Sequence, residues 1–534
     1  MAVFDFARIE GATVSERFGK AMEYLRNEPG SELSIPAGTY VITSERARET
    51  MECAISGRYG ENPEGTMFRP GYAFTEGISF SGIRGAVIRA EGVKLMVDGF
   101  MEPLALKDCS DIRIEGLTID YVRKPFSMGV IETFEKGAEP GTACITAVFD
   151  ERFPVDEHTI MPRVCAYDPE KAYFHIGMRV SDRTYLGNGR MAISLARIPD
   201  IDLTGMEFYL WHSFHYRPAI LIENAERIAL EDVTIHAQPG MGIVGHRSSD
   251  ILLKRLKVAP SEGLHMSTNT DATHFTSCRG YLRFEECEFE GHGDDATNVH
   301  TFYHDFEAVS PGRRTVRTRV DTLTHSLTLD YADAGDTLEL NERGSLLPRD
   351  SFTVLKSEPD FADGTALLTL DHPVPEGAEG MYLSNLSQMP RLSFVNCTCN
   401  NHWARSVLIK TRDAEVRGCT FRASALYAIH VAAEEGWHEG IAPAGIRITN
   451  NRFIACGEPA RTAIGGICVE MSADEPSGTP ISDIEISDNE FILPKAKTAI
   501  CVRNAENVRI LRNRIDTASR EKIIVSDCKD VRID

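Results

Sequence analysis

The sequence lacks several features that would place the protein in a membrane or outside the cell. No uninterrupted apolar run approaches the roughly 18 residues of a membrane-spanning helix, so no membrane span is expected. The N-terminal residues MAVFDFARIEGATVSERFGKAMEYL contain no basic segment followed by an apolar one, so no secretory signal peptide is expected either. Both absences favour a cytoplasmic location.

The cysteines also argue against a disulfide-stabilised protein. There are 13 of them, an odd number, scattered along the chain without a CxxC pair. In a chain without a secretory signal this pattern indicates reduced, mostly buried thiols. Positive charge is in short supply as well, because 57 Lys and Arg stand against 79 Asp and Glu, a formal net charge of −22. Such a field repels nucleic acid and anionic membranes and disfavours polyanionic substrates.

The chain is rich in short segments of alternating apolar residues, each followed by a turn, such as RIALEDVTIH, LRFEECEFEG and IEISDNEFIL. Several neighbouring segments are 22 to 24 residues apart, as in 258 − 235 = 23, 421 − 399 = 22 and 515 − 491 = 24, and longer intervals fit the same unit with an enlarged loop. The equivalent inward positions are Ile235, Val258, Phe289, Cys399, Phe421, Phe453, Phe491 and Ile515. A period near 23 in strand-rich units predicts a parallel β-solenoid with one coil per repeat.

Asn451, Asn489 and Asn513 fall where side chains would stack at a turn between successive coils. A β-sandwich of short strands is the alternative, although its strands are usually spaced more tightly, at about 8 to 12 residues. We therefore predict an all-β chain whose coils stack their inward side chains about 4.8 Å apart.

Three segments depart from the repeat. Thr13 to Glu16 form a capping box before an amphipathic helix that would cover the open end of the first coil. Residues 124–206 and 301–388 lack the coil pattern and are predicted to be inserted β modules, similar to small barrels. The predicted organisation is given in five parts: 1–123, the cap and first coils; 124–206, the first insert; 207–300, the central coils; 301–388, the second insert; and 389–534, the C-terminal coils.

Acidic residues gather about one coil apart in the central part. Asp271 lies 25 residues after His246, and Asp294 lies 23 residues after Asp271, followed directly by Asp295. At this spacing the side chains would stack on neighbouring coils. Carboxylates so close together resist simultaneous ionisation, so one should keep its proton and supply the acid that glycosidic cleavage needs. Asp294 and Asp295 can both take part only if the backbone bends there, which Gly291 and Gly293 would permit.

Other polar and aromatic residues are candidates for substrate contact. The GHGDDATNVH segment and the later HWARS and GWHEG segments supply them, and an exposed indole is a suitable platform for a sugar ring. For each Trp the alternative is core packing, and for the aspartates it is a solvated turn or a calcium site. The candidate substrate-binding residues are His246, His292, Asn298, His300, Trp403, Arg405, Trp437 and Glu439.

The segment DATHFTSCRG, followed by CEFEGHGDDATNVH, resembles glycoside hydrolase family 110, the α-1,3-galactosidases. The likeness extends through PAILIENAERIALEDVTIH, HWARSVLIKT and GWHEGIAPAGIRITNNRF, from about residue 80 to 455. The resemblance implies a right-handed parallel β-helix with inserted β-barrel modules and exo-acting, inverting removal of terminal α-1,3-linked galactose. It implies no cofactor and no metal, and it assigns the catalytic aspartates to Asp271, Asp294 and Asp295.

Our working mechanism has Asp294 donate a proton to the glycosidic oxygen while Asp271 and Asp295 deprotonate a water. The same aspartates resemble those of polygalacturonases, but Leu408 stands where the uronate-binding Arg of that family would be. A polysaccharide lyase and a non-catalytic glycan-binding β-helix are the remaining alternatives. The expected partner is a carbohydrate, with neither nucleic acid nor membrane, and the inserts could mediate assembly into a homo-oligomer.

Overall fold

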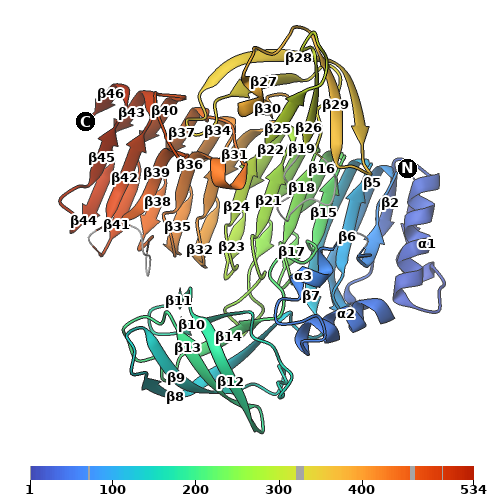
Figure 1. The fold of residues 1–534 in the computed structure, drawn as a ribbon. Coiled ribbons are helices and arrows are strands. Elements are labelled where there is room, and N and C mark those ends of the chain that lie inside the picture. Colours follow the sequence, from blue (N-terminus) through green and yellow to red (C-terminus); the bar gives the residue numbers. More distant parts are fainter. Residues whose placement is uncertain (1, 70–71, 320–329, 458–462, 496) are drawn as a thin grey trace.

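A long β-helix forms the body of the protein and carries one small β module on each of two sides (Figure 1). The computed structural model describes residues 2–69, 72–319, 330–457, 463–495 and 497–534. Its helices are α1 Val14–Asn27, α2 Glu45–Ile55, α3 Glu64–Met67 and the 3-10 turns η1 Phe6–Arg8, η2 Ala378–Gly380 and η3 Glu435–Trp437.

One face of the β-helix is an 11-stranded parallel sheet. In order it contains β4 Glu76–Ser79, β6 Glu102–Lys107, β15 Ile220–Glu223, β18 Ile243–His246, β21 Thr273–Thr276, β24 Thr297–His300, β33 Val407–Ile409, β36 Ile429–Glu434, β39 Ile464–Ser472, β42 Thr498–Arg503 and β45 Ile523–Ser526. Each strand contributes alternate side chains to the interior and to the outer face. The outer face of this sheet carries the candidate site.

The two remaining faces belong to a single 22-stranded sheet. One run of it comprises β1 Val3–Asp5, β2 Ser31–Ser34, the first halves of β5 Arg84–Asp98 and β7 Ser110–Tyr121, and β16 Glu226–Glu231, β19 Ser249–Lys254, β22 Arg279–Glu285, β31 Arg391–Val395, β34 Arg412–Arg417, β37 Ala444–Thr449, β40 Ile481–Ser487, β43 Ala505–Leu511 and β46 Lys529–Ile533. The other comprises β3 Gly38–Thr43, the second halves of β5 and β7, and β17 Thr234–Ile235, β20 Lys257–Val258, β23 Glu288–Glu290, β32 Thr398–His402, β35 Thr420–Ser424, β38 Arg452–Ile454, β41 Glu490–Leu493 and β44 Arg514–Thr517.

The coil register follows the spacing read from the sequence. Ile235 pairs with Val258 and Val258 with Phe289, and the same column continues through Cys399, Phe421, Phe453, Phe491 and Ile515. Within this column the rings of Phe453 and Phe491 stack with centroids 4.5 Å apart. The predicted parallel β-helix is therefore confirmed, including the equivalence of all eight inward positions.

An asparagine ladder closes the turns of the last coils. Nδ2 of Asn451 donates to Oδ1 of Asn489 over 3.0 Å, and Nδ2 of Asn489 donates to Oδ1 of Asn513 over 3.0 Å. Asn489 also donates to the backbone carbonyl of Ile448 over 2.9 Å. The amides thus satisfy buried backbone groups that the turns would otherwise leave unpaired.

The N-terminal helix α1 caps the open end of the β-helix, as predicted. The Thr13 side chain accepts a hydrogen bond from the Glu16 backbone N–H at 3.1 Å, which begins the helix. Phe18, Met22 and Leu25 form its buried face and join the main hydrophobic core. The cap covers apolar side chains that the first coil would otherwise expose.

The first insert is an antiparallel seven-stranded sheet in the order β11-β10-β14-β8-β9-β13-β12. Its strands are β8 Phe126–Lys136, β9 Thr142–Phe149, β10 Arg163–Asp168, β11 Tyr173–His175, β12 Arg179–Gly187, β13 Arg190–Ala196 and β14 Glu207–Trp211. Strand β14 pairs with β8 and β10, so the inserted sheet continues past the boundary at residue 206 that the sequence pattern indicated. The sequence of β14 does not alternate between apolar and polar residues, because nearly all of its side chains are buried.

The second insert contains a closed barrel in the order β25-β26-β29-β28-β27-β30. Its strands are β25 Tyr303–Ala308, β26 Thr315–Arg319, β27 Thr337–Asn341, β28 Pro348–Asp360, β29 Thr365–Leu370 and β30 Tyr382–Asn385. The barrel is inserted between β24 and β31, where one coil ends and the next begins. Phe352, Leu338 and Leu368 belong to its own small core.

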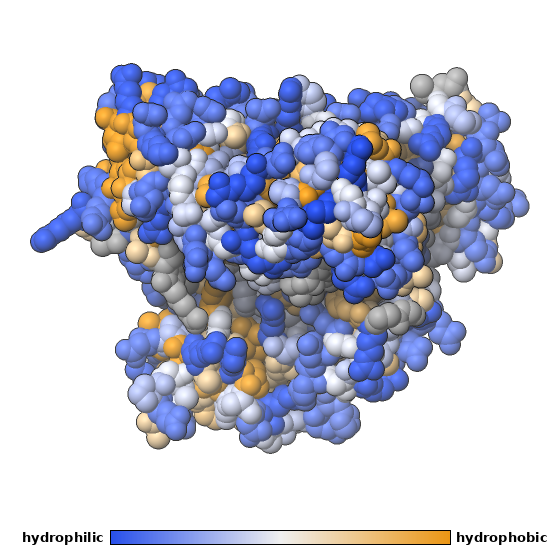
Figure 2. Space-filling model, turned by 45° about the horizontal axis from the view of Figure 1, so that its top comes forward, coloured by the Kyte–Doolittle hydropathy of each residue, from blue (hydrophilic) through white to orange (hydrophobic). Residues whose placement is uncertain are grey.

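The surface and the cysteines agree with the composition. Hydrophilic residues cover most of the face seen in Figure 2. All 13 cysteines lie within the described residues and are free thiols, and most are buried. No helix in the described part of the chain has the length and apolar character needed to cross a bilayer.

Candidate active site

A polar pocket of about 290 Å³ lies over the outer face of the 11-stranded sheet. Alternation in β21 and β24 directs Phe275 and Val299 into the apolar core and leaves His274 and Asn298 on the outer face. The pocket is lined by Glu64, His215, Met241, Thr270, Asp271, His274, Asp294, Asp295, Asn298, Arg405, Glu434, Trp437 and Glu439.

The three candidate aspartates meet in this pocket. Asp271 precedes β21, and Asp294 and Asp295 precede β24. Because Thr273 pairs with Thr297, the coil position above Asp271 is Asp295 (295 − 271 = 24). One oxygen from each of the three carboxylates lies within 4.8 Å of the others. The expected meeting of all three on consecutive coils is therefore found in the structure.

Two glycines allow the chain to bend before the aspartate pair. Gly291 has φ of +68°, and a Cβ there would lie 2.3 Å from the carbonyl oxygen of His265. A Cβ on Gly293 would lie 2.2 Å from the carbonyl oxygen of Asn269. Any larger residue would push the turn outward, so both glycines hold Asp294 and Asp295 against the preceding coil.

Asp295 is paired with Arg405 on the next coil. The Arg405 Nε and Nη2 atoms donate to Oδ1 and Oδ2 of Asp295, each over 3.2 Å, and the Arg405 backbone N–H donates to Oδ1 over 2.9 Å. The third arm of the guanidinium donates to Glu434 over 2.9 Å. A bidentate guanidinium contact is the geometry of an ionised carboxylate, so Asp295 is the natural anion of the group.

Asp294, unlike Asp295, is surrounded by groups that disfavour its ionised form. Burial raises the pKa of the Asp294 carboxyl well above its usual value, and repulsion from Asp295 and Asp271 raises it further. Among the described residues, none forms a hydrogen bond with this carboxyl group, whereas His292 Nδ1 donates to the Asp294 backbone carbonyl over 2.9 Å. Burial and the neighbouring carboxylates therefore favour the protonated form of Asp294, whose side chain lines the pocket and whose backbone is held by His292.

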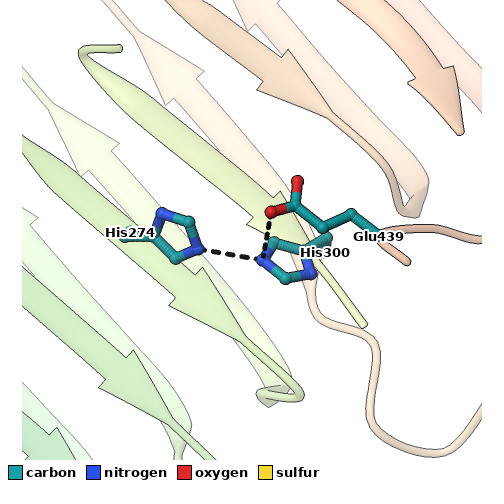
Figure 3. A group of neighbouring side chains, drawn as sticks. All are labelled: His274, His300 and Glu439. Atoms are coloured by element: carbon teal, nitrogen blue, oxygen red, sulfur yellow. Dashed lines mark hydrogen bonds and ion pairs between the residues drawn. The ribbon is translucent and has the colours of Figure 1, made fainter. Parts of the chain in front are cut away.

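Asp271 contacts the first of three further polar side chains, and Figure 3 shows these three, His274, His300 and Glu439. Its Oδ2 lies 2.7 Å from Nδ1 of His274, and Nε2 of His274 lies 2.9 Å from Nε2 of His300. His300 Nε2 in turn lies 3.6 Å from Oε1 of Glu439. The side chains come from two neighbouring strands and the turn after η3, and all are buried.

The hydrogen-bond partners fix where the protons of this chain lie. His300 Nδ1 faces the carbonyl oxygen of Thr301 at 2.8 Å, so it carries a hydrogen. Burial lowers the pKa of His274 to about 4 and that of His300 to about 3, which makes both rings neutral. His274 then donates through Nε2 and accepts through Nδ1, which requires a proton on Asp271. Burial, followed by repulsion from Asp295, raises the pKa of Asp271 in agreement with this arrangement.

Three groups among the described residues could supply three ligands each to a metal ion: His274, His300 and Glu439; His430, Cys468 and Glu470; and Asp271, Asp294 and Asp295. The first has two imidazoles and a carboxylate, a set suited to zinc. The Nε2–Nε2 separation of 2.9 Å equally fits a shared proton. Lys410 already contacts the Glu439 carboxylate, which reduces the charge available to a cation. The first group is thus explained without a metal.

Several predicted substrate-binding residues line the pocket. Asn298 donates through Nδ2 to Oε2 of Glu439 over 3.0 Å. Arg405 lies beside Asp295, and the Trp437 side chain is 55% exposed. These four residues, Asn298, Arg405, Trp437 and Glu439, surround the aspartates, and the exposed indole is free to stack on a sugar.

The structure places four other candidates away from the pocket lining. His246 pairs with Thr276, five positions beyond Asp271 (276 − 271), and its Nε2 lies 3.4 Å from Oδ1 of Asp330 in the second insert. The sequence spacing between His246 and Asp271 gave the wrong register, because the loop between β20 and β21 is longer than the corresponding loop between β17 and β18. Met241 therefore occupies the position below Asp271. Trp403 is also a packing residue, since its ring lies 4.0 Å from that of Trp211.

His292 and His300 act one layer behind the pocket. His292 stacks on His402 with ring centroids 4.3 Å apart and supports the Asp294 turn. His300 contacts His274 and Glu439 instead of the cavity. Neither ring lines the pocket, so their expected contact with substrate is revised to support of the residues that do.

The sequence did not single out several lining residues. Glu64, from α3, accepts backbone hydrogen bonds from Phe214 and His215 at 2.6 Å, and both it and His215 line the pocket. Glu64 and His215 lie outside the repeat, so no coil spacing could have indicated them. His274 stands in the same segment as Asp271, and a polar residue next to the apolar, inward-facing Phe275 could have been recognised as outward-facing.

The fold and site together define a right-handed parallel β-helix protein with an acidic pocket on one sheet. A family model for the right-handed β-helix region matches residues 407–534. A distant solved structure, the A-module of the Azotobacter vinelandii mannuronan C-5 epimerase AlgE6, is 10% identical with a TM-score of 0.42, and the match covers 99% of each chain.

The chain is similar in sequence to proteins named α-1,3-galactosidase. It is 29% identical to α-1,3-galactosidase A of Akkermansia muciniphila over 317 residues, which cover 58% of this chain and about half (51%) of that relative. It is 24% identical to α-1,3-galactosidase A of Bacteroides fragilis over 522 residues, covering 89% of this chain and 82% of the relative. α-1,3-Galactosidase B of Bacteroides thetaiotaomicron is 23% identical, with 89% and 79% covered. These relatives confirm the resemblance predicted from the aspartate motifs.

Proposed function

We propose that this protein is a glycoside hydrolase that removes terminal α-1,3-linked galactose from oligosaccharides or glycans. The observation that carries the proposal is the pocket in which a protonated Asp294 and an Arg405-bound Asp295 lie together. A protonated and an ionised carboxyl group on one surface are the acid and base of glycosidic cleavage. The names of the relatives supply the sugar and the linkage.

In the proposed reaction Asp294 donates its proton to the glycosidic oxygen as the bond to the anomeric carbon breaks. Asp295, with Asp271, orients a water and accepts its proton as the water attacks. Asp271 can act as an acceptor after passing its own proton to Nδ1 of His274, which lies 2.7 Å away. The chain through His300 to Glu439 then carries the resulting positive charge next to a carboxylate.

Stereochemistry is the most demanding part of the proposal. Inverting enzymes usually hold acid and base about 6.5–9.5 Å apart, whereas oxygens of the three aspartates lie within 4.8 Å of one another. Inversion therefore requires that the water be held at the far oxygens of Asp271 and Asp295, across the sugar from Asp294. A substrate that fills the pocket between them would favour this geometry.

Among the described residues that line the aspartate pocket, the polygalacturonase-like alternative finds no unpaired cation for the uronate. Arg405 is engaged by Asp295 and Glu434, and Lys410 by Glu434 and Glu439. A lyase would use a neutral Lys or Arg as base. Although burial lowers the pKa of Lys410, attraction to Glu434 and Glu439 outweighs it and raises that pKa, so the amine stays charged. The pocket chemistry thus favours a neutral galactoside.

The remaining expectations belong to the same proposal. A carbohydrate is the partner, and a cytoplasmic location is supported by 13 unbridged cysteines in a chain of this size. Assembly into a homo-oligomer through the inserts is proposed as well, and size-exclusion chromatography with light scattering measures it.

Incubation with a panel of α- and β-galactosides, followed by proton NMR, tests the reaction. We expect release of galactose from α-1,3-linked ends, with β-galactose appearing first. Early α-galactose would overturn inversion while leaving the hydrolase intact. An unsaturated product that absorbs in the near ultraviolet would indicate a lyase, and binding without turnover would indicate a glycan-binding protein.

A further inference from the structure

Three potential metal ligands lie on the outer face of the 11-stranded sheet, outside the lining of the aspartate pocket. Cys468 and Glu470 are alternate residues of β39, and His430 of β36 pairs with Cys468. The intervening Val469 belongs to the hydrophobic core, so Cys468 and Glu470 both point outward. The strand register therefore holds an imidazole, a thiol and a carboxylate side by side on two adjacent coils.

The three side chains are close enough to share one ion. A nitrogen of His430, Sγ of Cys468 and a carboxylate oxygen of Glu470 all lie within 4.8 Å of one another. Zinc bonds of about 2.0–2.3 Å hold tetrahedral ligand atoms about 3.3–3.8 Å apart, so these atoms need to approach by only about 1 Å. His430 and Cys468 are buried, whereas the Glu470 side chain is partly exposed and can make that adjustment.

The His430 ring presents one nitrogen to this group without a hydrogen-bond partner. Nη1 of Arg405 lies 3.2 Å from Nδ1 of His430 and can only donate, so Nδ1 accepts and the ring hydrogen lies on Nε2. Within the described part of the chain, the buried Nε2 atom has no hydrogen-bond partner, and Oε1 of Glu470 lies 3.6 Å from it. A buried polar atom without a partner requires an explanation, and an ion between the imidazole and the carboxylate supplies one.

Charge distinguishes this group from the one that contains Glu439. Nη1 of Arg503 donates to Oε2 of Glu470 over 3.1 Å, but the Arg503 side chain is 44% exposed and can turn into solvent when an ion arrives. Lys410, the cation on Glu439, is fully buried and has no such freedom. Cys468 also supplies a sulfur ligand, which favours zinc over the hard cations Ca²⁺ and Mg²⁺.

We propose that His430, Cys468 and Glu470 form a binding site for Zn²⁺, with a water as the fourth ligand. The ion joins β36 to β39 on the coils that follow the aspartate pocket. The site is separate from the proposed hydrolysis and does not depend on it.

Binding of the ion would rearrange the protons of the site. Cys468 releases its proton to solvent, because the thiolate is the form that binds a metal. The hydrogen of His430 moves from Nε2 to Nδ1, where Oε1 of Glu434 lies 3.9 Å away. Arg405 then loses its contact with His430 but keeps its hydrogen bond to Glu434. The ion thereby alters the surroundings of the guanidinium that holds Asp295.

The test uses the full chain, reduced and freed of metal by dialysis against EDTA, with Co²⁺ as a probe that reports thiolate ligands. We expect one equivalent of Co²⁺ to bind with a thiolate-to-cobalt charge-transfer band in the near ultraviolet, and Zn²⁺ to displace it. Cys468→Ser should lose the band. Glu470→Gln changes a partly exposed side chain, and it should keep the band but weaken Co²⁺ binding by more than about tenfold. Cys144→Ser, which removes an exposed thiol of the first insert, is the matched control and should behave as the parent.

Several results would overturn the site. They are a parent that binds no Co²⁺, a charge-transfer band that survives in Cys468→Ser, and parent affinity in Glu470→Gln. A band that falls equally in Cys144→Ser would indicate binding by scattered thiols and would overturn it as well. His274→Phe should keep the band, because the group that contains His274 has no thiol. Loss of the band in that variant would move the ion to the aspartate pocket and reject this site.

Discussion

His274 Nδ1 lies 2.7 Å from Oδ2 of Asp271, and it is the only link between that carboxyl and the buried chain of His300 and Glu439 among the contacts of the described residues. The pair can hold one proton on either side. With the proton on Asp271 the carboxyl is neutral, and with the proton on His274 it becomes the base that the proposed reaction uses. His274 is therefore a positioning residue that governs the charge of Asp271.

Replacing His274 with Phe should shift the pH dependence of the reaction. Without a partner that takes up its proton, Asp271 stays protonated to higher pH, so the acidic limb of the kcat/KM profile should move upward. A hydrogen bond to a charged group is worth about 1.5–3 kcal/mol, which corresponds to roughly 1–2 pH units. The measurement is the pH profile for hydrolysis of an α-1,3-linked galactosyl disaccharide.

His274→Asn provides the matched control, because its amide keeps a polar group beside Asp271 but cannot take up a proton. The acidic limb of this variant should move upward as in His274→Phe. An unchanged acidic limb in His274→Phe, or a parent profile in His274→Asn, would contradict the proposed role of His274 in taking up the proton.

Asp294 should set the alkaline limb of the activity. Burial raises its pKa, and an acid catalyst works only while protonated, so activity should fall as the pH rises through that pKa. Asp294→Asn should lower kcat on the disaccharide by roughly 10²–10⁴ and should abolish the alkaline limb. A 2,4-dinitrophenyl galactoside, whose leaving group needs no proton, should lose far less. Near-normal turnover of the disaccharide would exclude Asp294 as the acid.

The two tryptophans of the C-terminal coils should respond differently to replacement. Trp437 is 55% exposed in the pocket, so Trp437→Ala should raise KM about three- to tenfold with little change in kcat. Trp403 packs on Trp211, so Trp403→Ala should lower the free energy of unfolding by about 3 kcal/mol. Kinetics and denaturant unfolding of both variants test this division. A raised KM in Trp403→Ala without loss of stability would restore Trp403 as a substrate contact.

Metal ions should inhibit the reaction. A zinc ion between the Nε2 atoms of His274 and His300 would displace their shared proton and place a positive charge near the acidic cluster. That charge would favour the ionised form of Asp294 and remove the acid. We expect full activity after dialysis against EDTA and loss of activity on titration with Zn²⁺. Loss of activity in EDTA, with recovery on adding one metal, would instead identify the group as a metal centre.

The sequence predicted the parallel β-helix because equivalent inward-facing residues recur at a regular spacing, one for each coil. Each coil buries one equivalent side chain, so Phe421, Phe453 and Phe491 could be aligned before their rings were seen to stack. The aspartates were found in the same way. Spacing alone located Asp271, Asp294 and Asp295 on one patch, although it placed Asp294 above Asp271 where the register places Asp295.

The repeat spacing could not predict the residues whose positions depend on the loops between the strands. His246 has almost the same spacing as the aspartates, yet a longer loop before β21 shifts it to the level of Thr276. Glu64 reaches the pocket from the N-terminal region and contacts His215, 151 residues away. Such contacts depend on the paths of loops across the outer face of a sheet. These paths produce no repeating pattern in the sequence.

The barrel separates Asp295 from Arg405 by 110 residues, although the two lie on adjacent coils. During synthesis at about 5–20 residues per second, the acidic cluster would wait roughly 5–20 seconds for its guanidinium. Until then its mutual repulsion is relieved only by bound protons. The coil that follows the barrel therefore completes the charge balance of the pocket, and a chain stopped before Arg405 would carry an uncompensated acidic edge.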